Sequence, residues 1–85
     1  MEKNLIIKRI KQRIKDDILK DAGIDIRDDD PLITSGLIDS FSLVDLALIV
    51  EDLFNVRIED HELNSDSFDT LHGLAEIILT RLPSS

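Results

Sequence analysis

The chain contains no cysteine, tryptophan or tyrosine, and only three phenylalanines among its 85 residues. Without cysteine it forms no disulfide, offers no thiolate nucleophile and supplies no cysteine ligand to zinc, a composition that fits the cytoplasm. So few aromatic rings disfavour a stacking platform for single-stranded nucleic acid. The longest apolar run, Leu46–Val50, is far shorter than the roughly 20 residues of a membrane span, and Lys8, Arg9 and Lys11 interrupt the apolar stretch that a signal peptide needs. We therefore expect a small cytoplasmic protein with a single domain, residues 1–85, and no membrane span.

Charge is distributed unevenly along the chain, whose formal net charge is −8. Residues 1–20 carry seven basic and three acidic side chains, whereas residues 21–85 carry three basic and fifteen acidic ones. The acidic part should repel nucleic acid and attract basic protein surfaces. The basic part is either a phosphate-binding helix or, the interpretation that we favour, the solvated side of an amphipathic helix.

Hydrophobic periodicity predicts three main helices and a short one. In the first, Ile7, Ile10, Ile14 and Ile18 form one stripe, and Ala22-Gly23 is expected to end the helix with Gly23 in a left-handed conformation. A connection over residues 24–39 follows, which is unusually long for a compact domain, although four apolar side chains could anchor it: Leu32, Ile33, Leu37 and Ile38.

The second helix is expected to begin at Asp39 or Ser40 and to end near Phe54. Its core stripe is predicted to consist of Leu43, Leu46, Ala47, Val50, Leu53 and Phe54, and further apolar residues fall on the opposite side. The segment Val56–Ile58 is too short for a stable strand. Asp60–Asn64 is expected to form one helical turn. A last helix is expected to follow Asp69 and to stop at Pro83. The predicted fold is all-α, a small antiparallel four-helix bundle with a long first loop.

Signals for an enzyme or a metal centre are weak. His61 and His72 lie in expected surface segments and have no metal-ligand spacing. The acidic run 25–30 does not match a calcium-binding loop, because Arg27 occupies a ligand position. The three glycines are too far apart for a phosphate-binding loop. We therefore expect a protein that is not an enzyme and holds no metal.

The segment Gly36–Phe41, Gly-Leu-Ile-Asp-Ser-Phe, places Ser40 in the first turn of the second helix, directly after the long loop. At a helix N-terminus, free N–H groups and the positive end of the dipole favour an anion such as a phosphodiester. The residues alone leave a simpler interpretation open, in which Asp39 or Ser40 merely caps the helix.

The whole pattern resembles the acyl carrier proteins and related phosphopantetheine-binding carrier domains. The similarity is carried by Asp39–Leu46 (Asp-Ser-Phe-Ser-Leu-Val-Asp-Leu), by Val50–Phe54 (Val-Glu-Asp-Leu-Phe) and by the start of the last helix, Phe68–Leu71 and Leu74–Ile77. Mainstream fatty-acid carriers have a further acidic residue where this chain has Ser42. The form Gly-Leu-Ile-Asp-Ser-Phe looks more like stand-alone carriers of D-alanine or other aminoacyl groups, and like pathway-specific acyl carriers.

The resemblance implies that Ser40, next to Asp39, carries a 4′-phosphopantetheine arm delivered from coenzyme A by a phosphopantetheinyl transferase. An acyl or aminoacyl cargo would travel as a thioester on the thiol of that arm. The implied partners of this monomeric shuttle are that transferase, an acyl- or aminoacyl-loading ligase, and acyl-processing synthases or transferases with basic docking patches.

The resemblance also implies a docking surface on the second helix, which consists of Phe41, Val44, Asp45, Leu48, Glu51 and Asp52. Contacts of this kind give fast, salt-sensitive and weak association. Two alternatives stay open at this point. The apolar members of the set could pack under the first loop or the short helix, and the chain could be a cofactor-free helical module that binds a basic partner through its acidic second helix.

Overall fold

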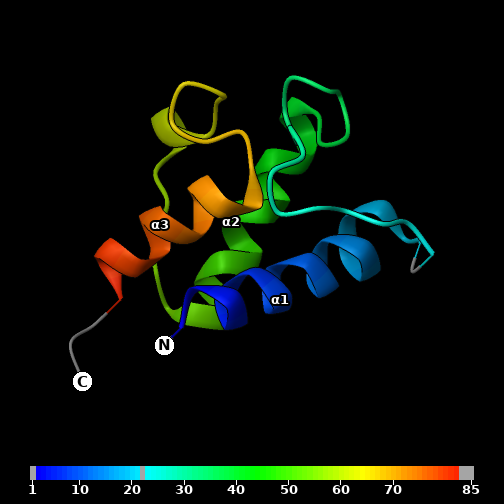
Figure 1. Ribbon diagram of the computed structural model, residues 1–85. Coiled ribbons are helices and arrows are strands. Elements are labelled where there is room, and N and C mark those ends of the chain that lie inside the picture. The colour runs from blue at the N-terminus through cyan, green and yellow to red at the C-terminus, as the bar shows by residue number, and fades with distance from the viewer. Residues whose placement is uncertain (1, 22, 83–85) are drawn as a thin grey trace.

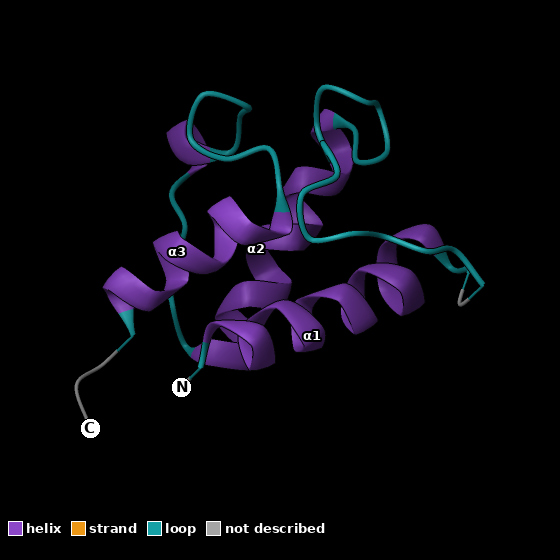
Figure 2. Ribbon diagram, viewed as in Figure 1, coloured by secondary structure: helices purple, strands orange, loops and turns teal. Residues whose placement is uncertain are grey.

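The computed structural model describes residues 2–21 and 23–82, and every regular element in these ranges is helical (Figures 1 and 2). The elements are α1 (Lys3–Arg13), the π-helix η1 (Ile14–Leu19), α2 (Ser40–Phe54), the 3₁₀ turn η2 (Asp60–Glu62) and α3 (Leu71–Arg81). The all-α prediction is confirmed, with three main helices and one short turn. No helix in the described ranges is both long and apolar enough to cross a bilayer.

Helix α1 and its continuation η1 form the lower layer in Figure 1, and α1 packs against both α2 and α3. In this view α1 runs from left to right and α3 runs back above it, while α2 crosses behind them. The isoleucine stripe is buried at Ile7, Ile10 and Ile14, and Ile18 is half-buried. Ile6, which the stripe did not include, is also fully buried, because α1 is covered by neighbours on two sides.

The first helical segment ends earlier than the sequence predicted. Lys20 adopts the left-handed conformation, with φ 53° and ψ 38°, and its N–H donates to the Lys15 carbonyl. The expected stop at Ala22-Gly23 was therefore wrong in position, and Ala22 itself lies outside the described residues. The stop was expected from the preference of glycine for the left-handed conformation, but Gly23 does not have a positive φ, and Lys20 adopts that conformation instead at the end of the π-helix.

The long loop is part of the core. Ile26, Leu32 and Ile38 are each at most 1% exposed, although the sequence had singled out only the last two. Asp69, just before α3, holds this loop from the other side: its carboxylate accepts hydrogen bonds from the Ile33 N–H at 2.8 Å and the Thr34 N–H at 3.0 Å. The Thr34 hydroxyl also donates a hydrogen bond to the Asp69 carboxylate. This bond first, and then the backbone bonds, lower the pKa of Asp69. A segment that looks irregular in sequence is thus fixed by burial and by one carboxylate.

The predicted stripe of α2 is largely confirmed. Its most buried members are Leu43, Leu46, Val50 and Phe54, whereas Ala47 and Leu53 are only half-buried. Ile49, which the stripe omitted, is buried because the first helical segment covers a second side of α2. After α2, the short segment Val56–Ile58 forms no strand, as expected, but it buries two side chains in the core.

The first turn of α3 is capped by Thr70, whose hydroxyl accepts a hydrogen bond from the Gly73 N–H at 3.0 Å. Four predicted members of its stripe are buried, namely Leu71, Leu74, Ala75 and Ile78, and Leu82 is half-buried. The expected stop at Pro83 lies outside the described residues.

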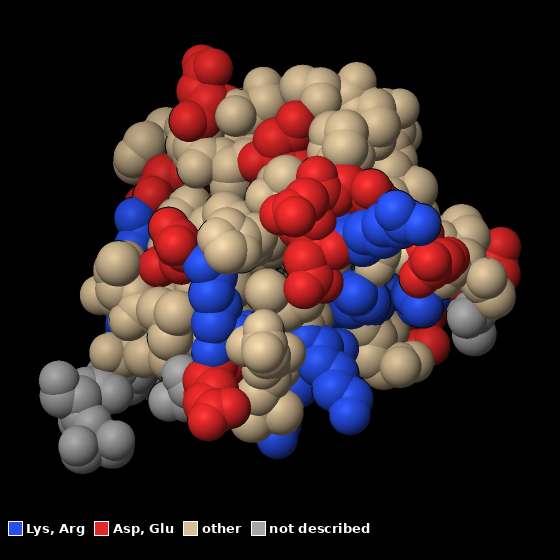
Figure 3. Space-filling model, in the orientation of Figure 1, with Lys and Arg blue, Asp and Glu red and all other residues tan. Residues whose placement is uncertain are grey.

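The basic side of α1 is not simply solvated, which corrects the sequence interpretation in part. Three of its cations reach other elements: Lys3 to Glu76 of α3, Lys11 to Asp28 of the loop, and Arg13 to Asp52 of α2. In Figure 3 basic side chains gather over the lower part of the molecule, around α1, with acidic ones mainly above them. Opposite charges that the sequence separates into two segments are thus brought together across the fold.

Acid should weaken the contact between η2 and α3. Glu62 receives two hydrogen bonds from the Arg81 guanidinium and one from the Glu59 N–H at 3.1 Å, which lower its pKa from 4.5 to about 2. Because the folded-state pKa is the lower one, the contribution of this carboxylate to stability is complete above about pH 4.5 and is lost progressively towards pH 2.

We therefore expect Glu62→Gln to lower the melting temperature at pH 7 by roughly 2–4 °C and to have little effect near pH 2. Thermal unfolding between pH 2 and pH 7 checks this. Glu51→Gln is the control, because Glu51 has no ion-pair partner among the residues that the structure describes. A deficit of Glu62→Gln that stays constant down to pH 2 would contradict the assignment.

Candidate functional site

The long loop connects to α2 through a turn at Gly36. Gly36 has a φ of 82°, in the left-handed region that favours glycine, and its N–H donates to the Ile33 carbonyl at 3.1 Å. The Ile38 N–H then donates to the Leu32 carbonyl at 2.9 Å, and both side chains are buried. The residues immediately before α2 are therefore fixed by the core.

Asp39 caps α2 and thereby settles which of the two candidate residues performs that role. Its carboxylate accepts a hydrogen bond from the Ser42 N–H at 2.8 Å, as expected of an N-cap aspartate. Hydrogen bonds from the backbone and side chain of Ser42 lower the pKa of Asp39 below its ordinary value, so this carboxylate stays ionised in neutral solution.

Ser40, the first residue of α2, is exposed, and its hydroxyl has no hydrogen-bond partner among the described residues. A side chain that only capped the helix would accept an N–H from the next turn, but Asp39 does so instead. The serine hydroxyl is thus available to a partner in solution and lies where the positive end of the α2 dipole favours an attached anion. This environment fits a serine-linked phosphodiester.

The six residues predicted for docking are all exposed on α2. Three of them are apolar, and their exposed fractions are large: 85% for Phe41, 52% for Val44 and 60% for Leu48. The alternative in which these side chains pack under the first loop or the short helix is therefore wrong. We call Phe41, Val44 and Leu48 the apolar strip of α2.

The acidic members of the set differ from one another. Asp45 and Glu51 have no ion-pair partner among the described residues, whereas Asp52 accepts a hydrogen bond from Arg13 Nη1 at 3.0 Å. The same guanidinium donates through Nε to Asp17 at 2.8 Å, and these two carboxylates, Asp17 first, raise the pKa of Arg13. Asp17 and Arg13 were missed in the sequence, because nothing in the periodicity of the first helix shows that they face α2.

Both histidines lie on the surface, as predicted. His72 lies beside α1, where Lys3 Nζ is 2.8 Å from both His72 Nε2 and Glu76 Oε1. Within residues 2–21 and 23–82, no group of three or more histidines and carboxylates is placed to hold a metal ion.

The comparisons with known proteins give the family of the chain. Residues 8–78 match the family model described as the phosphopantetheine attachment site. Over 63 residues the chain is 36% identical to the D-alanyl carrier protein of Leuconostoc citreum (strain KM20), which covers 72% of this chain and 81% of that protein. No solved structure is significantly similar to the chain. The chain therefore belongs to the phosphopantetheine-binding carrier proteins, which are not themselves catalytic and hold 4′-phosphopantetheine as a covalent group.

Proposed function

We propose that Ser40 is the attachment residue, and that the protein is a stand-alone carrier of acyl or aminoacyl groups between the enzymes of a biosynthetic pathway. One observation at the start of α2 supports this proposal. Asp39 caps the helix, and the hydroxyl of the neighbouring Ser40 is exposed and has no hydrogen-bond partner among the described residues. A serine that served as the cap would occupy the N-cap position and accept an N–H from the first turn, which is what Asp39 does here.

The residues around Ser40 suit a phosphodiester. The position is exposed, so an attached arm displaces no core side chain, and the dipole of α2 favours the negative charge. When attached, the arm supplies a terminal thiol for the cargo thioester, a group that this cysteine-free chain lacks. The fixed loop and the Asp39 cap hold the backbone at Ser40 in place for a modifying enzyme.

For the cargo we propose a small aminoacyl group, with D-alanine as the first to test. Support comes from the relative named as a D-alanyl carrier protein, and the segment Gly36–Phe41 resembles that of aminoacyl carriers as well as that of pathway-specific acyl carriers. A loading ligase would activate the amino acid, and a second transferase would take it from the arm.

For the docking of these enzymes we propose the exposed side of α2, that is, the apolar strip together with Asp45, Glu51 and Asp52. Exposed apolar side chains interleaved with carboxylates suit brief contact with apolar, basic patches. Such contacts let a shuttle leave one enzyme for the next.

The first experiment is the intact mass of the protein after incubation with coenzyme A, Mg²⁺ and a broad-specificity phosphopantetheinyl transferase. We expect the gain of a single 4′-phosphopantetheine and, by fragmentation, its location on Ser40. A gain on another residue would overturn the site, and no gain with any of several transferases would overturn the function.

The modified protein then tests the cargo. Incubated with ATP, D-alanine and a D-alanine-activating ligase, it should gain a D-alanyl group that hydroxylamine removes, as expected of a thioester. L-alanine and a short fatty acid with its own ligase are the comparisons. Preferential loading of the fatty acid would contradict the aminoacyl assignment and leave the carrier role in place.

A further inference from the structure

Two segments that are far apart in sequence meet just before the attachment site. The long first loop and the residues that lead into α3 lie side by side in Figure 1. Asp69 joins them through four hydrogen bonds: its carbonyl accepts from the Leu32 N–H at 2.6 Å, and its carboxylate accepts from the Ile33 N–H, the Thr34 N–H and the Thr34 hydroxyl, the last at 2.6 Å. One residue thus binds three consecutive residues of the loop.

These bonds continue towards the attachment residue. The Leu32 carbonyl accepts a hydrogen bond from the Ile38 N–H at 2.9 Å, and both side chains are at most 1% exposed. Ile38 is followed directly by the Asp39 cap and by Ser40. An unbroken series of hydrogen bonds therefore runs from Asp69 through Leu32 to the residue two positions before Ser40.

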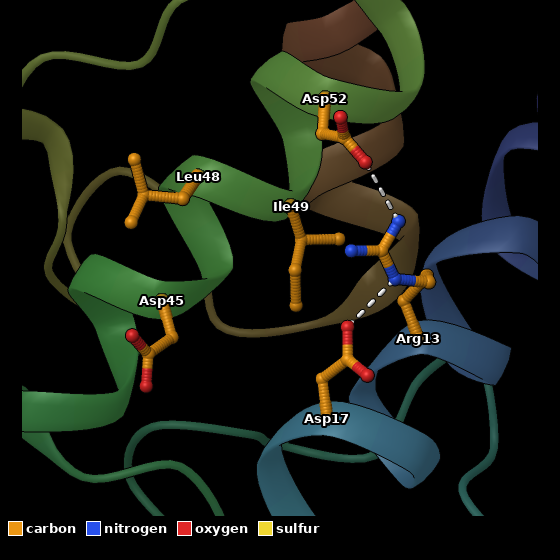
Figure 4. A pocket seen from close by; sticks show the side chains of 6 residues that line it. All are labelled: Arg13, Asp17, Asp45, Leu48, Ile49 and Asp52. Carbon is orange, nitrogen blue, oxygen red and sulfur yellow. Dashed lines mark hydrogen bonds and ion pairs between the residues drawn. The ribbon is translucent and has the colours of Figure 1, made fainter.

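The far half of α2 is attached to the fold in a different way. Asp52 accepts a hydrogen bond from Arg13 Nη1 at 3.0 Å, and the same guanidinium bonds Asp17 (Figure 4). Among the residues that the structure describes, no ion pair of this kind reaches the first turn of α2. The position of Ser40 therefore depends on the packing of the core and on the loop that Asp69 binds.

The loop that Asp69 binds also lies at the surface, where Thr34, Ser35 and Gly36 are exposed. An enzyme that covers a surface of ordinary size around Ser40, about 800 Å² per protein, also covers these residues. A loop that loses a bond to the rest of the fold spends time in other shapes. A partner that binds only one shape then shows an apparent affinity reduced by the fraction of molecules that have that shape.

We propose that Asp69 is a positioning residue for the modification of Ser40. Its carboxylate, bonded to Ile33 and Thr34, keeps the loop before α2 in the shape that the phosphopantetheinyl transferase binds. Asp69 acts through the loop and does not itself contact the serine. This proposal rests on the proposed function, because it concerns the same reaction, and it adds to the site a residue that lies just before α3.

The test is to measure kcat and KM separately for modification by a broad-specificity phosphopantetheinyl transferase, from the appearance of the modified mass at a temperature where every variant is folded. We expect Asp69→Ala to raise KM roughly 5–20-fold and Thr34→Val roughly 3–10-fold, with kcat within about 2-fold, because the enzyme must first select the correct loop shape. Thr34→Ser keeps the hydroxyl that bonds Asp69 and should restore the KM of the unchanged protein.

Two controls separate positioning from stability. Thr80→Val removes an exposed hydroxyl at the other end of α3, where it donates to the Ile77 carbonyl at 2.7 Å. Glu62→Gln weakens the contact between η2 and α3 and leaves the bonds of the loop in place. Both controls should keep KM within about 2-fold of the unchanged protein, because the loop retains its shape.

Amide hydrogen exchange follows the loop without the transferase. In Asp69→Ala the Ile38 N–H, which bonds Leu32, should exchange roughly 10-fold faster, because the loop opens locally. The increase should exceed that of the Leu46 N–H in the middle of α2, which reports the opening of the helix itself. Equal increases at Ile38 and Leu46 would contradict a local effect of Asp69 on the loop.

The outcomes separate this inference from the proposed function. If the unchanged protein is modified on Ser40 but Asp69→Ala and Thr34→Val have the KM of Glu62→Gln, Asp69 is only structural and the carrier assignment stands. A loss confined to kcat, or a Thr34→Ser variant as impaired as Thr34→Val, would also overturn the positioning role. If Asp69→Ala does not fold, the two Thr34 variants decide, because this side chain is exposed. If the unchanged protein takes up no arm at all, both proposals fail.

Discussion

Replacing Ser40 by alanine is expected to abolish incorporation of 4′-phosphopantetheine completely, while the protein remains folded. The reason is that the hydroxyl is the proposed attachment atom and has no structural partner among the described residues. The N-cap bond of α2 belongs to Asp39 and survives the change. Because the side chain is exposed, the melting temperature should change by less than about 2 °C.

The control for this prediction is Ser42→Ala. Ser42 lies two residues farther along α2 and is half-buried, and alanine retains the bond from its N–H to the Asp39 cap but loses the contribution of its hydroxyl. Intact mass should show full modification of Ser42→Ala and none of Ser40→Ala. Residual incorporation in Ser40→Ala would place the arm on another hydroxyl, whereas loss of folding in that variant would show that Ser40 has a structural role that its exposure does not reveal.

Replacing Leu32 by alanine is expected to have the largest effect on stability, although Leu32 lies in a loop. Its side chain is 0% exposed in the core, its N–H donates to the Asp69 carbonyl, and its carbonyl accepts from the Ile38 N–H at 2.9 Å. Leucine-to-alanine changes at buried positions cost about 2–5 kcal/mol, which is most of the stability of a domain this small.

Chemical denaturation and thermal unfolding measure this loss. A cost of about 2–5 kcal/mol corresponds to a fall of roughly 10–30 °C in melting temperature. The matched control is Leu5→Ala, because Leu5 is 41% exposed on α1 and its truncation should cost less than about 0.5 kcal/mol. Similar losses in the two variants would contradict the assignment of the loop to the core.

The regular part of the fold was predictable because it depends on local signals. The second helix was expected from Asp39 or Ser40 to Phe54 and is found from Ser40 to Phe54, since an N-cap residue and a long apolar stripe mark its limits. The end of the first helical segment was not predictable in the same way. There the chain turns at Lys20, a residue with no intrinsic preference for a left-handed conformation.

In the candidate site too, the residues set by local sequence signals were predictable and those set by tertiary packing were not. The exposure of Ser40 and of the outer side of α2 was predicted from the motif and the family resemblance and is found in the structure, and their roles in attachment and docking stay predictions. Arg13 and Asp17 were not predicted, because their place beside α2 depends on how two helical segments pack. Asp69 was noted only as the residue before a helix, and its bonds to residues 36 and 35 positions earlier in the chain, Ile33 and Thr34, leave no pattern in the sequence.

Those bonds to Asp69 have a consequence for the time at which the carrier can be modified during its synthesis. The backbone and carboxylate of Asp69 accept hydrogen bonds from the loop before Ser40. A nascent chain in which Asp69 is not yet available therefore lacks the acceptor of these bonds. Contacts between residues so far apart in sequence also form late in folding, because closing a long loop costs entropy. The attachment segment should therefore acquire its final shape only after the start of α3 has left the ribosome, and we expect the transferase to act on the folded domain.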